Sequence, residues 1–97
     1  MQELKKLKLI DNEFYPKEAK EILMNIFSSK ILFHEMKNFS SIERFGREDI
    51  NALKRILELK LSMENISEII LEAEKMDEKI LIQSEVIIKT VRQSELC

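Results

Sequence analysis

The sequence predicts a mainly α protein with a small β part, in the order β-α-α-β. A heptad stripe runs through residues 47–76, which is typical of a long helix packed against a partner helix. A run rich in β-branched residues follows it, which favours a strand. Gly46 and Pro16 are the only glycine and proline, and tryptophan is absent, which argues against a turn-rich β-sandwich. We therefore expect a long antiparallel helical hairpin with a two-stranded antiparallel sheet at its base, completed by dimerisation.

Length and composition fit one domain spanning residues 1–97. At 97 residues only about 60–65% of the unfolded surface can be buried, so a partner subunit would add to a modest core. The net charge of −2 lacks the basic excess typical of general phosphate-backbone binding. The single cysteine, Cys97, excludes an intrachain disulfide, and no stretch reads as a signal peptide or a membrane span. A cytoplasmic protein without membrane association is expected.

The N-terminal part predicts a short strand, a turn and a helix start. Residues 4–10 alternate partly between leucine and lysine, which indicates a half-buried strand; a frayed tail is the alternative. Asp11-Asn12 has turn chemistry. Pro16 suits the first position of a helix, and Glu18 would place a negative charge in its first turn.

Residues 16–38 show helical spacing of apolar positions. One stripe expected to face the second helix comprises Ala19, Ile22, Ile26, Ser29, Phe33 and Met36, widened by Leu23 and Phe27. Met24, Ile31 and Leu32 fall elsewhere on the wheel, so this helix is apolar on more than one side. Such a helix usually has more than one neighbour.

A short turn over residues 40–46 is expected between the helices. Ser40 and Glu43 have the spacing of a capping box, and Gly46 would take a positive φ after one helical turn. The alternative starts the second helix at Ser41 and encloses Gly46, at a cost of about 1 kcal/mol relative to alanine.

The second helix is expected over residues 47–76, with Glu48 and Asp49 in its first turn. A second stripe on its N-terminal half is the predicted dimer contact. The heptad seam expected to face the first helix comprises Ala52, Ile56, Leu59, Met63, Ile66, Ile70 and Ala73. The stripe predicted as the dimer contact comprises Ile50, Leu53, Leu57 and Leu61. Glu64, Glu68 and Glu72 form an acidic face, interpreted as solvated surface or as a patch for a basic partner.

Asp77-Glu78 would end this helix, and residues 79–91 predict the second strand, followed by a polar tail at 92–97. One strand face would carry Ile80, Ile82, Ser84, Val86, Ile88 and Thr90. Two strands alone are only marginally stable, and both helices carry surplus apolar surface. These features together predict a homodimer, the commonest closed oligomer.

The sequence contains no recognisable catalytic or metal-binding constellation, and no cofactor is expected. His34 is the only histidine, so it cannot build the usual metal sites alone. A nucleophile such as Ser40, Ser41 or Cys97 could pair with His34 and Glu43. However, no nucleophile elbow or oxyanion-shaped glycine loop accompanies them. An enzyme is therefore not expected.

The densest polar and aromatic cluster is expected at the hairpin tip, as the contact site for a ligand, an anion or a partner: His34, Asn38, Ser40, Ser41, Arg44, Phe45 and Arg47. Capping and surface ion pairs are the simpler interpretation of that cluster. A basic N-terminal cluster leaves a nucleic-acid-associated regulator as an alternative: Lys5, Lys6, Lys8, Lys17 and Lys20. The favoured hypothesis is a small homodimeric module for protein–protein interaction or assembly.

Overall fold

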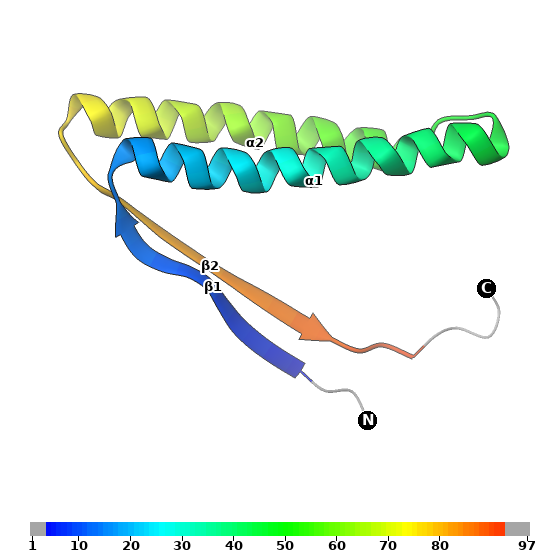
Figure 1. Ribbon diagram of the computed structural model, residues 1–97, viewed down its shortest axis with the longest axis horizontal. Coiled ribbons are helices and arrows are strands. Elements are labelled where there is room, and N and C mark those ends of the chain that lie inside the picture. Colours follow the sequence, from blue (N-terminus) through cyan, green and yellow to red (C-terminus); the bar gives the residue numbers. More distant parts are fainter. Residues whose placement is uncertain (1–3, 93–97) are drawn as a thin grey trace. The chain divides into compact units, whose positions relative to one another are not determined.

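The computed structural model describes residues 4–92 and has the predicted order of elements (Figure 1). Its helices and strands are β1 (Leu4–Phe14), α1 (Pro16–Phe45), α2 (Ile50–Lys75) and β2 (Ile80–Lys89). The two helices form an antiparallel hairpin, and β1 and β2 form an antiparallel two-stranded sheet. The predicted mainly α fold, with an antiparallel helical hairpin and a two-stranded antiparallel sheet in the order β-α-α-β, is confirmed.

The chain divides into two compact units. The hairpin unit spans Phe14–Ile80, and the sheet unit combines the strand residues up to Glu13 with those from Leu81. The open end of the hairpin is closed within its own unit, where the Lys79 ammonium lies 4.8 Å from the ring centroid of Tyr15. A lysine above an aromatic face is an attractive contact, so it helps to hold the two ends of the hairpin together.

The seam of α2 is the predicted heptad stripe. All seven of its members are buried or half-buried, with Ala52, Leu59, Ile70 and Ala73 the most covered. Spacings of three and four keep these side chains on one side of the helix, where they pack against α1. Among residues 4–92 no polar or charged residue is buried, so the seam is held by apolar packing.

The seam of α1 agrees with the prediction only in its N-terminal half. Ala19 is fully buried, and Ile22 and Ile26 are half-buried. Farther along, Phe33 and Met36 are 56% and 64% exposed, so placing them on the inner stripe was wrong. Ile31, set apart from that stripe, is buried instead. The reason is that polar residues occupy the inner face of this half of α1, as described below.

α1 begins as predicted but ends later. The backbone N–H of Tyr15 donates to the Glu18 carboxylate (3.2 Å), and Pro16 takes the first helical position. The helix continues to Phe45, seven residues beyond the expected end at Asn38, so the expected turn over 40–46 is wrong. It ends at Gly46, whose φ of 68° is the left-handed conformation that glycine adopts without a steric cost.

The Ser40–Glu43 capping box does not form a helix start, because Ser40 lies inside α1. α2 starts at Ile50 rather than near Arg47, since Asp49 is its N-cap: the Asp49 carboxylate accepts a hydrogen bond from the Ala52 N–H at 3.0 Å. The alternative in which Gly46 lies within the second helix is also excluded, because Gly46 precedes α2 by four residues.

The end of α2 is a Schellman motif without glycine. The Glu78 N–H donates to the Ala73 carbonyl (2.9 Å) and the Asp77 N–H to the Glu74 carbonyl (3.3 Å). Asp77 provides the left-handed residue, with φ of 54°. Aspartate tolerates this conformation better than most residues, so the expected end at Asp77-Glu78 has a definite mechanism.

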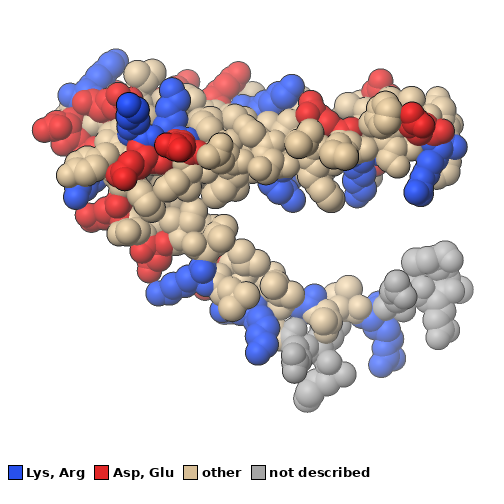
Figure 2. Space-filling model, viewed as in Figure 1, with Lys and Arg blue, Asp and Glu red and all other residues tan. Residues whose placement is uncertain are grey.

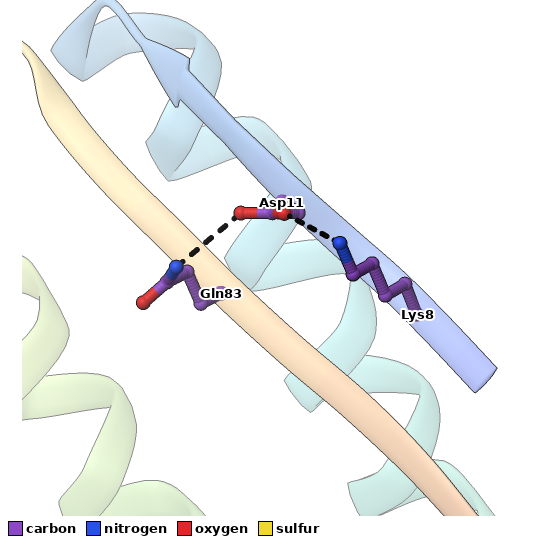
Figure 3. A network of polar contacts seen from close by, with 3 residues as sticks. All are labelled: Lys8, Asp11 and Gln83. Atoms are coloured by element: carbon purple, nitrogen blue, oxygen red, sulfur yellow. Dashed lines mark hydrogen bonds and ion pairs between the residues drawn. The ribbon is translucent and has the colours of Figure 1, made fainter. Parts of the chain in front are cut away.

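β1 is longer than the expected 4–10, and the predicted turn at Asp11-Asn12 is wrong, because both residues belong to the strand. Asp11 is held between the strands: its carboxylate accepts from the Gln83 amide of β2 (3.3 Å) and from the Lys8 ammonium (3.2 Å), as Figure 3 shows. Turn-forming residues can lie in a strand when a neighbouring strand supplies hydrogen bonds, which sequence alone did not reveal.

β2 lies inside the expected range of 79–91, and its burial alternates as predicted only from Ile80 to Ser84, because Val86, Ile88 and Thr90 of the predicted face are exposed. Ile82 is buried, and Ile80 and Ser84 are half-buried, whereas Leu81 and Gln83 between them are exposed. Cys97 and nearly all of the expected polar tail lie outside the described residues. Over residues 4–92, neither helix has an apolar stretch sufficient to cross a membrane.

Candidate interaction surfaces

The inner face of the hairpin tip carries three of the predicted tip residues. His34, Asn38 and Ser41 follow one another at i, i+4 and i+7 on α1, so they share one side of the helix. The Asn38 side-chain oxygen accepts from the Asp49 N–H at 2.7 Å. The Ser41 hydroxyl donates to the Arg47 carbonyl at 2.9 Å. These bonds hold residues 46–49 against α1, so Asn38 and Ser41 satisfy backbone groups of the connection.

The other predicted tip residues lie apart from this inner face. Ser40, Arg44 and Phe45 are exposed, and the Arg47 side chain is exposed although its carbonyl accepts the Ser41 bond. The cluster that is dense in sequence therefore divides into an inner row, in which Asn38 and Ser41 form hydrogen bonds, and an exposed outer part. Asp49, whose backbone N–H binds Asn38, was not assigned to the tip cluster. Its position directly before the first apolar residue of α2 is the typical signal of an N-cap.

His34 lies at the edge of the seam with an unpartnered nitrogen. Its Nε2 atom is buried without a hydrogen-bond partner among the described residues, and its ring contacts Phe33 edge-on at 5.2 Å between centroids. Loss of hydration lowers the pKa of His34 from its ordinary value of 6.5, and the positive charges of Lys30, Arg55 and Lys37 lower it further, while Asp49 opposes them. The neutral imidazole is therefore the favoured form at neutral pH.

A cleft of about 130 Å³ adjoins His34 and is lined by His34, Lys37, Asp49, Asn51 and Ala52. Ligand pockets for ordinary small molecules have volumes of about 300–1,000 Å³, so this cleft has room only for something much smaller. Within residues 4–92, no group of three or more histidine, cysteine or acidic side chains is arranged to hold a metal ion.

The predicted dimer stripe on α2 is an exposed apolar row. Ile50, Leu57 and Leu61 are 71%, 60% and 51% exposed, whereas Leu53 is half-buried. On a helix of 3.6 residues per turn these three exposed side chains lie opposite the seam that packs on α1. We call Ile50, Leu57 and Leu61 the α2 outer stripe.

A second exposed row lies on α1. A second apolar side of this helix was expected from Met24, Ile31 and Leu32, but Leu32 is the only one of the three that is exposed. Leu32, Met36 and Phe39 are 55%, 64% and 62% exposed and follow the i, i+4, i+7 rule. They lie opposite the inner row of His34, Asn38 and Ser41 by helical geometry. We call them the α1 outer stripe. The sequence contained this spacing, but Met36 was assigned to the inner face because the polar inner row was not recognised as such.

The last two turns of α1 extend past the start of α2, as Figure 1 shows. The bond from Asp49 to Asn38 brings the start of α2 to the level of Asn38, so Phe39–Phe45 has residues 46–49 beside it rather than a helix. Ile42 and Phe45 in this segment are 42% and 67% exposed. Apolar exposure is therefore concentrated toward the tip end of the hairpin.

Charged side chains are interspersed rather than gathered on the face of the hairpin shown in Figure 2, where lysines and arginines lie among acidic residues. The expected basic cluster divides between β1, which carries Lys5, Lys6 and Lys8, and the first turns of α1, which carry Lys17 and Lys20. The three glutamates Glu64, Glu68 and Glu72 are all exposed on α2.

Comparison of the chain with protein-family models, with curated proteins and with solved structures finds no match. The fold and its exposed surfaces are therefore the basis for a functional proposal.

Proposed function

We propose that this chain is a non-catalytic protein–protein interaction module that acts as a homodimer through the outer faces of its helical hairpin. The observation that carries the proposal is the pair of outer stripes. All six of their side chains are more than half exposed, although each belongs to a type that proteins usually bury. Rows of exposed apolar side chains are typical of interaction sites on protein surfaces.

The interior of a single chain supports the same proposal. Three of the seven buried apolar residues are alanines, and no large side chain is fully buried among residues 4–92. Hydrophobic stabilisation scales with apolar area removed from water, about 25 cal/mol per Å², so small side chains contribute little. A second copy on the α2 outer stripe would add the leucine and isoleucine burial that one chain lacks.

The α2 outer stripe is the favoured contact for the second copy because its regularly spaced apolar side chains lie on the side of α2 that faces away from α1. The α1 outer stripe, which points away from α2 and therefore in the opposite direction, would then remain for a further protein partner. Aromatic and methionine side chains such as Phe39 and Met36 are typical of such contacts.

The test is the oligomeric state of a variant with two charges in the α2 outer stripe. We expect the wild-type chain to sediment as a dimer at tens of micromolar. Leu57→Glu with Leu61→Glu should sediment as a monomer and keep its helical circular dichroism, because both side chains point away from the seam. Burying an unpaired carboxylate in an apolar contact costs far more than the contact gains.

The matched control adds the same change of charge elsewhere on α2. Lys75→Glu also makes the chain more negative by two charges, at an exposed polar position about 21 Å along the helix from Leu61. This control should remain a dimer. A wild-type monomer with full helicity at the same concentration would reject the proposal.

A further inference from the structure

The two strands leave unpaired backbone edges. Within residues 4–92 the sheet contains only β1 and β2, so each strand has one partner and one free edge. A free edge is a template for another strand, and natural proteins guard such edges with charge, proline or a covering element. The sequence of each strand shows which edge is guarded and which is suited to pairing.

β1 is poorly matched to a second copy of itself. When two copies of one strand pair antiparallel, a two-fold axis normal to the sheet passes beside one residue of the strand. Each residue a given number of positions before that point then lies opposite the residue the same number of positions after it in the second copy. With the axis at Leu7, Lys6 would face Lys8 of the second copy. With the axis at Lys8, that ammonium would face its own copy. With the axis at Leu9, Lys5 would face Glu13, but Leu7 would face an acidic side chain, Asp11. Like charges directly opposite each other are destabilising, so the lysines of β1 guard its edge.

β2 is matched to itself when the axis lies at Ile87. Glu85 then faces Lys89 of the second copy, and the symmetry makes this ion pair twice. Within β2 the opposite pairs are Ile87 with Ile87, Val86 with Ile88, and Glu85 with Lys89. Beyond the end of the strand, Ser84 would face Thr90, Gln83 would face Val91 and Ile82 would face Arg92. Apolar, opposite-charge and hydroxyl pairs are each favourable across antiparallel strands.

Other registers lose this match. Moving the axis by one residue, to Val86 or Ile88, sets Glu85 against Ile87 or Ile87 against Lys89. An axis at Glu85 sets that carboxylate against itself. An axis at Ser84 pairs several apolar residues, but it leaves Lys89 facing Lys79 of the second copy. The Ile87 register alone among these pairs Glu85 and Lys89 with opposite charges.

The exposure of β2 favours the same segment. Val86, Ile87 and Ile88 are 38%, 59% and 49% exposed, whereas Ile82 near the other end of the strand is already buried in the single chain. Register in a strand is specified by which side chains must be covered, and here the uncovered ones centre on Ile87.

We propose that β2 pairs antiparallel with β2 of a second copy about a two-fold axis at Ile87, which makes a four-stranded sheet in the order β1-β2-β2-β1. This inference rests on the proposed homodimer and adds a defined strand contact to it. Four strands also remove the marginal stability of an isolated two-stranded sheet.

The first experiment is disulfide trapping in a Cys97→Ser background, so that the introduced cysteine is the only one. Ile87→Cys should give a covalent dimer under mild oxidation, because directly opposite Cβ atoms lie about 4.5–5.5 Å apart, close to disulfide geometry. Leu81→Cys is the matched control, since Leu81 is 58% exposed against 59% for Ile87. In this register two copies of position 81 are about 40 Å apart, so Leu81→Cys should stay monomeric on a non-reducing gel.

The second experiment reverses the charges. Glu85→Lys alone and Lys89→Glu alone each place like charges opposite one another twice, so each should weaken dimerisation roughly tenfold. The double variant Glu85→Lys with Lys89→Glu restores opposite pairs and should return the dissociation constant close to that of the wild type. Rescue of this kind would not follow if either side chain acted only within its own chain.

The outcomes separate this inference from the proposed function. A wild-type dimer in which Ile87→Cys fails to cross-link, or in which Leu81→Cys or Ser84→Cys cross-links as well, overturns the Ile87 register and leaves the dimer standing. A wild-type monomer overturns both.

Discussion

The helical hairpin and the two-stranded sheet differ in how completely each covers its apolar side chains within one chain. Both are built from amphipathic elements, but the hairpin has a continuous seam with a cap at the start of α2 and a Schellman motif at its end. The sheet has one buried residue, Ile82, and exposed polar contacts. The hairpin is organised by contacts within one chain, whereas the sheet has much to gain from a second chain.

The difference arises from how each element pairs its backbone. A helix satisfies its hydrogen bonds internally and needs a partner only for its apolar side. A strand has two backbone edges that can pair and an apolar side to cover, and two strands supply each other with one edge. Similar apolar content therefore gives an ordered hairpin seam and an incompletely covered sheet.

The largest effect should come from the seam of the hairpin. Ile70 is 2% exposed and Ile69, its neighbour, is 60% exposed. Ile70→Ala should reduce the free energy of unfolding by about 3 kcal/mol, through lost burial and the cavity left behind. Ile69→Ala should change it by less than about 1 kcal/mol. Urea unfolding at one fixed protein concentration would measure both, because the stability of a dimer depends on concentration. Equal losses would show that the seam does not dominate stability.

An intermediate effect on the free energy of unfolding is expected from two aspartates, one in each unit, which should differ in how much each contributes. Asp49 caps α2 from a partly buried position, so Asp49→Ala should cost about 1 kcal/mol of unfolding free energy. Asp11 in β1 makes an exposed ion pair with Lys8, so Asp11→Ala should cost no more than about 0.5 kcal/mol. The same chemical deletion is thus expected to matter more in the hairpin. A larger loss from Asp11→Ala, measured in the same urea series, would reverse this comparison.

The smallest effect should be a pH dependence from His34. Because the pKa of His34 is lowered in the folded chain, the unfolded chain binds the proton more readily below pH 6.5. Stability should therefore fall as the pH is lowered through 6.5, and this contribution should level off below the folded pKa. His34→Gln should remove that part of the slope. As the only histidine, His34 gives a single imidazole titration by NMR, and a midpoint above 6.5 would contradict the expectation.

The sequence was sufficient for the order of elements, the α2 seam and the positive φ of Gly46, because each depends on local spacing or local sterics. It was not sufficient for the end of α1. Ser40 and Glu43 have the spacing of a helix start, but continuing α1 to Phe45 lets Asn38 and Ser41 bind the returning backbone. That benefit depends on where residues 46–49 lie, which periodicity does not encode.

The exposed apolar surfaces of the two helices, like the helix ends, could be predicted only in part. The α2 stripe of Ile50, Leu57 and Leu61 was identified from spacing alone, and its exposure agrees with an outward face. A second apolar side of α1 was expected, but only Leu32 of the α1 outer stripe was placed on it, because the stripe containing Met36 was assumed to face the neighbouring helix. In this half of α1 the polar row faces inward and the apolar row faces outward. A single sequence does not distinguish these two choices.

The bond between Asp11 and Gln83 joins residues 72 positions apart. Closing a flexible loop of that length costs about 4 kcal/mol from the logarithmic term alone. Once the hairpin has formed, the contact of Tyr15 with Lys79 has already brought the two ends together, and most of that cost has been met. We therefore expect β1 and β2 to pair late in folding. The free edge of β2 would then become available to a second copy only in chains whose helices have already paired. Assembly would then follow folding in time, and incompletely folded chains would lack the edge needed to recruit one another.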